Sequence, residues 1–299
     1  MVTDSIYIGI GILFMTVIPV CSYYFGGKRK IPVSRMWLFL WTLISVFLEL
    51  LIYGNSELLL GFILGSSLCY LLVVMGVAYL MSPATRIELP PESNYYFSFV
   101  SVVVLILSTD YLFQANVRLN RINRIDGILL LLLLFIFLIA GFRKFPLEEY
   151  VSFVKETEHK GKIFGIHVLL TLSIFLGSYF LVKGLIGVSM RKTFGFSVTS
   201  FFILPWISNG INMFAGRERR AAEAMEFSAT TETLFFYLFA FALGGIWSQV
   251  PVFYDYIYAF IFFALIQILL NFREKVNRSL AGSLMLTVYI AFAVCRFLW

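Results

Sequence analysis

The sequence predicts an all-α polytopic membrane protein with ten transmembrane helices in two inverted five-helix repeats. Composition is the first reason: 60% of the 299 residues are hydrophobic and 13% are charged, against about a quarter charged in soluble domains. A soluble fold of this length cannot bury so much apolar surface. The other two reasons are a succession of ten apolar runs and an uneven distribution of lysine and arginine between them.

Each apolar run is long enough to be a membrane span, which needs roughly 20 mostly apolar residues. The first half holds runs at 6–25, 36–53, 58–81, 95–113 and 127–142. The second half holds runs at 163–190, 198–214, 224–246, 252–272 and 280–299. The first run has no basic start and no small-residue cleavage site, which predicts a true helix rather than a signal peptide.

The basic residues predict the orientation of these helices. Loops after odd-numbered runs carry most of the lysines and arginines, including the clusters at 28–30, 143–144 and 217–220. The opposite loops hold only Arg118, Arg121, Arg124, Arg191 and Lys192. The positive-inside rule therefore predicts that both termini are non-cytoplasmic.

A long loop at 143–162 divides the chain. Leu147, Tyr150, Val151 and Val154 recur at helical spacing among charged residues, which predicts an amphipathic helix on the cytoplasmic face. The predicted organisation is a first five-helix repeat at 1–142, this linker, and a second repeat at 163–299. Five is odd, so the second half enters the membrane in the opposite sense, as in many transporters with a substrate site between their halves.

The two halves share a weak internal match. Residues 33–41 (VSRMWLFLW) resemble residues 198–206 (VTSFFILPW), and both stretches begin the second helix of their half. Apolar helices resemble one another by chance, so this match alone leaves a repeat and a coincidence equally open.

Two further motifs point to a family. Residues 55–70 (NSELLLGFILGSSLCY), with a closing Ser82-Pro83, resemble the third helix of the cation/calcium exchanger superfamily. Residues 124–134 (RIDGILLLLLL) are similar to the start of that family's fifth helix. The resemblance implies a transporter that exchanges Ca²⁺ for Na⁺ or H⁺ at a central site. Ca²⁺ is a hard cation that takes six to eight oxygen ligands, several of them charged.

The expected carboxylates are largely missing from the first half. The family glutamate of the second helix would fall near Trp41, where Thr42 and Ser45 are the only polar residues. In the third helix Phe62, Ser67 and Tyr70 replace the motif asparagines, and Ser66 keeps the hydroxyl position.

The second half departs from the family motif in the same way. Pro205 is kept, but Trp206 stands where the family has glutamate, and Ser208 and Asn209 follow it. In the eighth helix Ser228 aligns with the motif serine and Glu232 with the acidic ligand. The predicted ion-site residues are Glu232, Ser228, Ser208, Asn209, Ser66 and Thr42, and the replaced ligand positions are Trp41, Tyr70, Trp206 and Phe62. The two indoles are expected to fill part of the cavity, and the metal is left unspecified.

Charged residues inside the spans need a reason, because each costs at least ~2.5 kcal/mol to insert. Glu232 is interpreted equally as a cation or proton site and as a structural hydrogen-bonding group. Lys183 has three readings: it reaches the interface, pairs with Glu49 or Asp110, or acts as a tethered positive charge. Thr233 is expected to be an ordinary packing residue.

Two function hypotheses follow. The first is a secondary cation transporter with an altered site that does not bind Ca²⁺ in the family's usual way. The second is a transport-inactive subunit of a membrane complex, with a dry centre and a membrane-protein partner at the 143–162 loop. The predicted partners are membrane lipids and an inorganic cation or proton. No enzyme motif, cofactor site or nucleic-acid-binding feature is found.

Overall fold

The computed structural model describes residues 2–22, 35–81, 99–100, 102–104, 106–107, 121–142, 160–190, 198–215, 219–248 and 278–298. Every regular element in these ranges is a helix, which confirms the all-α prediction. The predicted count of ten spans is not confirmed, because the run at 252–272 lies outside the described residues and the run at 95–113 is described only in short pieces. The amphipathic linker also lies outside them, apart from its last three positions.

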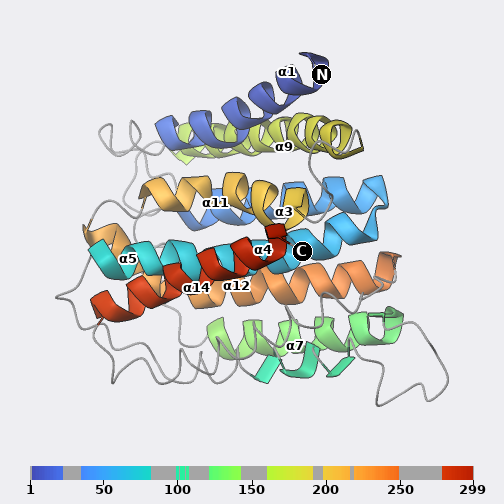
Figure 1. Cartoon of the computed structure of the whole chain (residues 1–299), viewed down its shortest axis with the longest axis vertical. Coiled ribbons are helices and arrows are strands. Elements are labelled where there is room, and N and C mark those ends of the chain that lie inside the picture. Colours follow the sequence, from blue (N-terminus) through green and yellow to red (C-terminus); the bar gives the residue numbers. More distant parts are fainter. Residues whose placement is uncertain are drawn as a thin grey trace.

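The helices lie side by side in layers (Figure 1). The first half contributes α1 (Val2–Ile12), η1 (Leu13–Val17), α3 (Arg35–Tyr53), α4 (Ser56–Leu68), η2 (Cys69–Val74), α5 (Met75–Met81) and α7 (Arg124–Phe142). The second half contributes α9 (Lys160–Met190), η3 (Thr199–Ile203), α11 (Leu204–Ala215), α12 (Arg219–Ser248) and α14 (Arg278–Leu298). Among the described helices, the stretches Thr3–Ser22, Ser56–Met81 and Gly165–Met190 are long and apolar enough to cross a membrane.

Local signals in the sequence set the helix ends. Gly54, at φ +76°, ends α3 in a conformation that favours glycine. Asn55 then caps α4, because its side-chain oxygen accepts a hydrogen bond of 3.0 Å from the Leu58 N–H. At the start of α7 the Asn123 side chain accepts from the Ile125 N–H, and Asp126 accepts from the Asn123 N–H at 2.8 Å. This reciprocal cap gives Asp126 the architectural role expected of an acid at a helix start.

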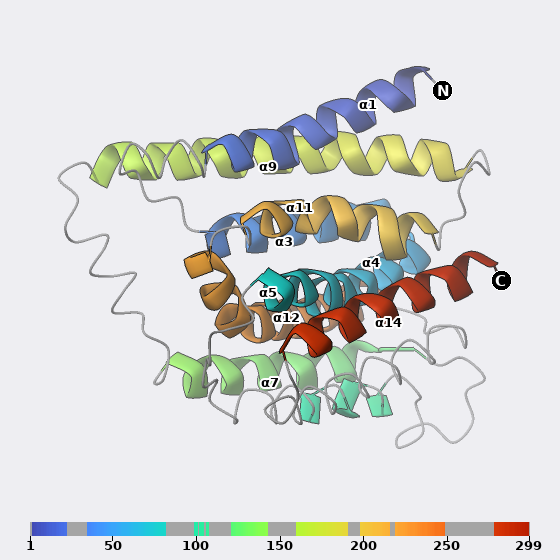
Figure 2. The ribbon, with the colours of Figure 1, turned by 60° about the vertical axis from the view of Figure 1, so that its left-hand side comes forward.

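The core of the protein is the continuous helix α4–η2–α5. All of its residues from Leu58 to Gly76 are buried, and α3, α11, α12 and α14 pack around it (Figure 2). A helix that is apolar on every side is stable only when it is enclosed in this way. Its few polar side chains must therefore find partners within the protein or in something that it binds.

The helix pairs map onto one another when each helix is replaced by its counterpart in the other half. Helix α1 packs on α9, α7 packs on α12, and α14 packs on α5. Each crossing is close because glycine lies in it: Gly127 and Gly245 between α7 and α12, Gly76 and Gly282 between α5 and α14, and Gly184 where α9 meets α1. An internal twofold relation produces such a pattern, which favours the predicted inverted repeat. The division at 142 and 163 remains a prediction.

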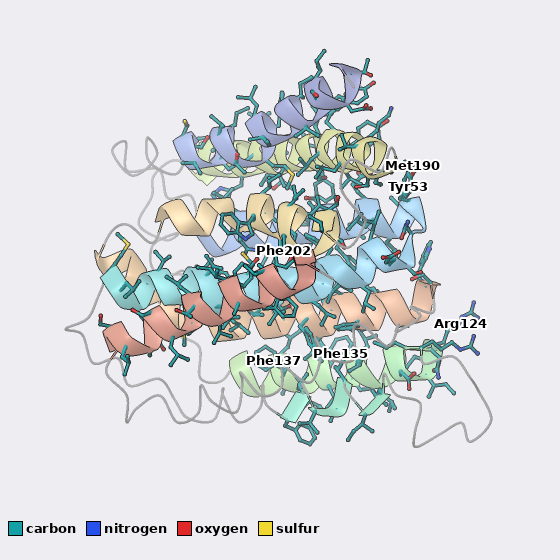
Figure 3. The ribbon with its side chains drawn as sticks, in the orientation of Figure 1. Tyr53, Arg124, Phe135, Phe137, Met190 and Phe202 are labelled. Atoms are coloured by element: carbon teal, nitrogen blue, oxygen red, sulfur yellow. The ribbon has the colours of Figure 1, made fainter. Side chains whose placement is uncertain are left out.

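The described chain ends point to the same side. The N and C ends lie on one side of the helix layers in Figure 2. In Figure 3 Tyr53, Met190 and Arg124, which end α3, end α9 and begin α7, lie at this side as well. This agrees with the even number of predicted spans. Which side is cytoplasmic remains a prediction from the basic loops.

The glycine crossings give a test of the packing. A methyl group on Gly127 would lie 2.7 Å from the Ala242 carbonyl oxygen, and one on Gly282 would lie 2.7 Å from the Gly76 carbonyl oxygen. Backbone atoms cannot move aside easily, so Gly127→Ala and Gly282→Ala should each lower the stability by about 1–3 kcal/mol. Thermal unfolding of the purified protein in detergent measures this.

The matched control is Gly165→Ala on α9, where no atom lies within 4 Å of the added carbon. Alanine is the better helix former by about 1 kcal/mol, so this variant should unfold at an equal or higher temperature. Equal destabilisation of all three variants would contradict the close crossings.

Candidate ion site

Seven buried polar side chains lie on the four helices expected to hold an ion. We call them the polar layer: Thr42 and Ser45 of α3, Ser66 and Ser67 of α4, Ser208 and Asn209 of α11, and Thr233 of α12. Each is at most 1% exposed. Helix α4 packs against α3, α11 and α12, and α3 packs against α11 and α12. The fold thus brings together the helices that carry the predicted site residues Thr42, Ser66, Ser208 and Asn209.

Most of these side chains bond to their own helix. The Thr42 hydroxyl donates to the Leu38 carbonyl at 2.7 Å, and the Ser208 hydroxyl donates to the Leu204 carbonyl at 2.7 Å. Ser45, Ser67 and the Asn209 amide nitrogen donate in the same way, three or four residues back. A hydroxyl in an apolar helix usually donates its proton to a backbone carbonyl of the same helix in this way. The oxygen lone pairs are left to accept or to coordinate.

Three oxygen atoms of the polar layer have no hydrogen-bond partner in the described structure. They are Ser66 Oγ, Asn209 Oδ1 and Thr233 Oγ1, one on each of α4, α11 and α12. An unpaired polar atom at this depth costs about 1–3 kcal/mol. Because these three atoms lie on helices that pack together, this part of the core is a candidate site for a ligand.

An aromatic cluster lies beside the polar layer. Phe47 of α3 and Phe62 of α4 both meet Phe236 of α12, with ring centroids 6.4 and 6.0 Å apart. We call these three residues the aromatic cap. Each lies a few residues from a polar-layer residue, always toward the end of the bundle that holds Gly54. Phe62, which the sequence analysis aligned with a motif asparagine, thus contributes apolar packing.

The two indoles do not fill the centre, contrary to the expectation from sequence. Trp41 contacts Phe175 of α9, with centroids 5.6 Å apart. Trp206 is 50% exposed, and its indole N–H donates to the Tyr289 hydroxyl of α14 at 2.8 Å. Both rings lie against helices that contribute nothing to the polar layer. The physical reason for Trp206 is its N–H, which must find an acceptor when partly buried.

Tyr289 connects Trp206 to the core helix. Its hydroxyl also bonds the buried thiol of Cys69, where η2 begins. Phe202 adds a ring contact to Tyr289, with centroids 6.0 Å apart, and is labelled in Figure 3. Trp206 therefore belongs to an interhelical contact between α11, α14 and η2.

Two π-turns lie next to the polar layer. Helix α4 passes into η2 at Cys69, and η3 leads into α11 just before Pro205. The expected break at Pro205 is a widened turn rather than an interruption. π-turns are frequent at functional sites, and they loosen the carbonyl ladder. They offer additional oxygen atoms close to Ser66 and Ser208.

The other residues named in the sequence analysis lie in different environments. Tyr70 is fully buried in η2. Ser228 and Glu232 belong to the backbone of α12, but their side chains lie outside the described residues. Lys183 is exposed on α9, where its ammonium donates to the Tyr179 hydroxyl at 3.2 Å and lies 5.2 Å from the Tyr7 ring centre. This placement is far better suited to an interfacial lysine than to a charge tethered in the polar layer.

Thr233 is a buried residue of the polar layer that the sequence analysis did not name as a site candidate. It was taken as a packing residue because Ser228 and Glu232 matched the family motif better. The one feature of the sequence that could have drawn attention to Thr233 is its position one turn before the aromatic pair Phe236 and Tyr237. In the described part of the chain, no group of three His, Cys, Asp or Glu side chains could hold a metal ion.

The comparisons with known proteins agree on one fold. Residues 42–142 match the family model described as sodium/calcium exchanger protein. The sodium-calcium exchanger NCX_Mj soaked with 100 mM Na⁺ and 10 mM Sr²⁺ is 15% identical, with a TM-score of 0.66 over 97% of each chain. Native YfkE is 16% identical, with a TM-score of 0.64 over 100% of this chain and 91% of its own. No curated protein sequence matches the chain.

The contact of Trp206 with Tyr289 can be tested with a double-mutant cycle. Trp206→Phe removes the indole donor, and Tyr289→Phe removes the acceptor. Each should lower the stability in thermal unfolding by about 0.5–1.5 kcal/mol. The double variant should lose less than the sum, because both changes remove the same bond. Strictly additive losses would contradict the contact.

Proposed function

We propose that this chain, a divergent relative of the sodium/calcium exchangers in its fold and in residues 42–142, is a secondary cation transporter with an altered ion site. The observation that carries the proposal is the set of three unpaired, buried oxygen atoms between α4, α11 and α12. Oxygen atoms are the ligands that hard cations take. The candidate residues are Ser66, Ser208, Asn209 and Thr42 from the sequence, with Glu232 and Ser228 on α12 and Thr233 added.

The inference that the ion site is altered rests on the low negative charge of the polar layer. A Ca²⁺ ion takes six to eight oxygens, several of them charged. The polar layer consists of hydroxyls and one amide, and Glu232 is the single acid within four residues of any of its unpaired atoms. We infer that the protein does not bind Ca²⁺ in the usual way of the family. Binding of inorganic cations or protons in the membrane is the partner chemistry that this site supports.

The architecture supports alternating access between two inverted halves, 1–142 and 163–299. The exchanged pairings of α7 with α12 and of α14 with α5 favour it. With the basic loops on the cytoplasmic side, both termini are placed outside, and the 143–162 linker lies on the cytoplasmic face. That linker is also the surface that we propose for a membrane-protein partner.

A second function is favoured by the aromatic cap. Phe47, Phe62 and Phe236 pack apolar rings beside the polar layer. A transport-inactive subunit of a membrane complex would have such a dry, filled centre. The unpaired oxygens weigh against it, since a purely structural core has no reason to keep them.

Calcium transport provides the first test. The purified protein in liposomes should show no Ca²⁺ uptake when a Na⁺ or H⁺ gradient is imposed, because the polar layer lacks the charge that Ca²⁺ requires. Uptake is followed with an enclosed Ca²⁺-sensitive dye. Gradient-driven Ca²⁺ entry would contradict the altered site, and the same liposomes with a calcium ionophore show that the dye responds.

Glu232→Gln provides the second test. If Glu232 carries a proton or balances a cation, the substitution should abolish cation flux or shift its pH dependence, because glutamine cannot titrate. Flux across liposomes is measured between pH 5 and pH 8 in the range where carboxyl groups in membranes titrate. Glu57→Gln at the first turn of α4 is the control. An unchanged pH profile in Glu232→Gln would assign that residue a structural role.

A further inference from the structure

Helices α1 and α9 pack on each other and form one outer layer of the described structure (Figures 1 and 2). They are antiparallel, because Gly184 meets the Asp4 turn of α1, whereas Gly177 meets η1. One face of α9 is a stripe of exposed residues, which runs through Leu169, Leu172, Leu176, Tyr179 and Lys183. In a bilayer the leucines of this stripe contact acyl chains, and the stripe ends on a positive charge.

Two lysines bracket the apolar run of α9. Residues 163–182 contain no Lys, Arg, Asp or Glu, and Lys162 and Lys183 flank them. These 20 helical residues span about 30 Å, which is the thickness of the hydrocarbon core of a bilayer. Lys183 therefore lies at the boundary between acyl chains and headgroups, on the side of the bundle where α9 ends at Met190.

Two tyrosines hold the Lys183 ammonium at a defined place between α1 and α9. It donates to the Tyr179 hydroxyl at 3.2 Å and lies 5.3 Å from the Tyr179 ring centre and 5.2 Å from that of Tyr7. Tyr7 is itself stacked on Phe180, with ring centroids 5.7 Å apart. A lysine that only reaches for water extends toward the helix end, whereas Lys183 bonds one turn back, toward the middle of the apolar run.

This arrangement leaves hydrogen-bond donors for a ligand. A lysine ammonium has three N–H donors, and the Tyr179 hydroxyl accepts one of them. Tyr179 keeps its own O–H proton to donate to another acceptor. The described acid on the adjoining turn of α1 is Asp4, which is 9% exposed and has its Oδ1 against Gly187. Lys183 and Tyr179 together suit a negatively charged, acceptor-only group, and at the headgroup boundary that group is a lipid phosphate.

We propose that Lys183 and Tyr179 bind the phosphate of an anionic phospholipid in the leaflet at the Met190 end of α9. The Lys183 Nζ and the Tyr179 hydroxyl donate to phosphate oxygens, and an acyl chain lies along Leu176 and Leu172. The face of the Tyr7 ring holds the ammonium, so both helices build the site. A zwitterionic lipid is disfavoured, because its own cationic group is repelled by Lys183. This site is separate from the polar layer and does not depend on the proposed transport function.

Binding is tested on the purified full-length protein in detergent, with the unfolding temperature as the readout. Dioleoyl phosphatidylglycerol and dioleoyl phosphatidylcholine share their acyl chains and differ in net charge. Phosphatidylglycerol should raise the unfolding temperature saturably, since a ligand of the folded state stabilises that state. Phosphatidylcholine should have a smaller effect at every concentration. Equal effects of the two lipids would overturn the anionic headgroup.

Three variants test the two donors. Lys183→Met removes the charge and should weaken the apparent affinity for phosphatidylglycerol about fivefold or more. Tyr179→Phe keeps the ring, removes the hydroxyl and should weaken it about threefold. Lys183→Arg keeps the charge and should retain the preference for phosphatidylglycerol. Unchanged affinity in both Lys183→Met and Tyr179→Phe would overturn the site.

The matched control is Lys162→Met, which removes the same charge at the other end of the same apolar run. Its affinity for phosphatidylglycerol should equal that of the unchanged protein. Equal losses in Lys162→Met and Lys183→Met would show a general attraction between anionic lipid and cationic protein, and would overturn the site.

Glycerol 3-phosphate separates the lipid from a free phosphate. It carries the phosphate without acyl chains, so it should not raise the unfolding temperature at the concentrations at which phosphatidylglycerol does. An equal rise with glycerol 3-phosphate that is lost in Lys183→Met would overturn the lipid as the ligand.

Discussion

Complete enclosure of the helix α4–η2–α5 is the constraint on which the other features depend. From Leu58 to Gly76 no side chain is exposed, so no polar atom there can be satisfied by bulk water. Ser67 bonds back to its own helix, and Cys69 bonds to Tyr289. Ser66 does neither. In an environment where an unpaired hydroxyl is costly, this exception identifies the place in the core where a ligand is expected.

The enclosure is achieved by close helix crossings. The pairs Gly127 with Gly245 and Gly76 with Gly282 let α7 and α14 approach the core to backbone distance. Without side chains at these points, van der Waals packing replaces the hydrophobic driving force that membrane helices lack. Each of these two crossings joins a helix of the first half to a helix of the second, so the two halves are held together in the same manner at both.

The residues at two positions where the resemblance implies ligands make packing contacts instead. Trp206, in a ligand position, turns to α14 and hydrogen-bonds Tyr289, while phenylalanines pack beside the centre. The described polar layer consists of hydroxyls and one amide. The exchanger fold is kept at about 15% identity, since the fold depends on helix packing rather than on the ligands. Helix packing therefore maintains the architecture without those ligands.

The sequence by itself determined the all-α membrane architecture, because composition and run length leave an apolar chain no other structure in a bilayer. It also offered Ser66, Ser208, Asn209 and Thr42 as candidate ligands, from the resemblance and from polar residues near the expected positions. It could not place Thr233 or the two indoles. A helix that is apolar on all sides shows no periodicity that says which face points inward. Only the packing of α11 against α14 and of α4 against α12 decided which side chains meet, because these contacts join residues far apart in the chain.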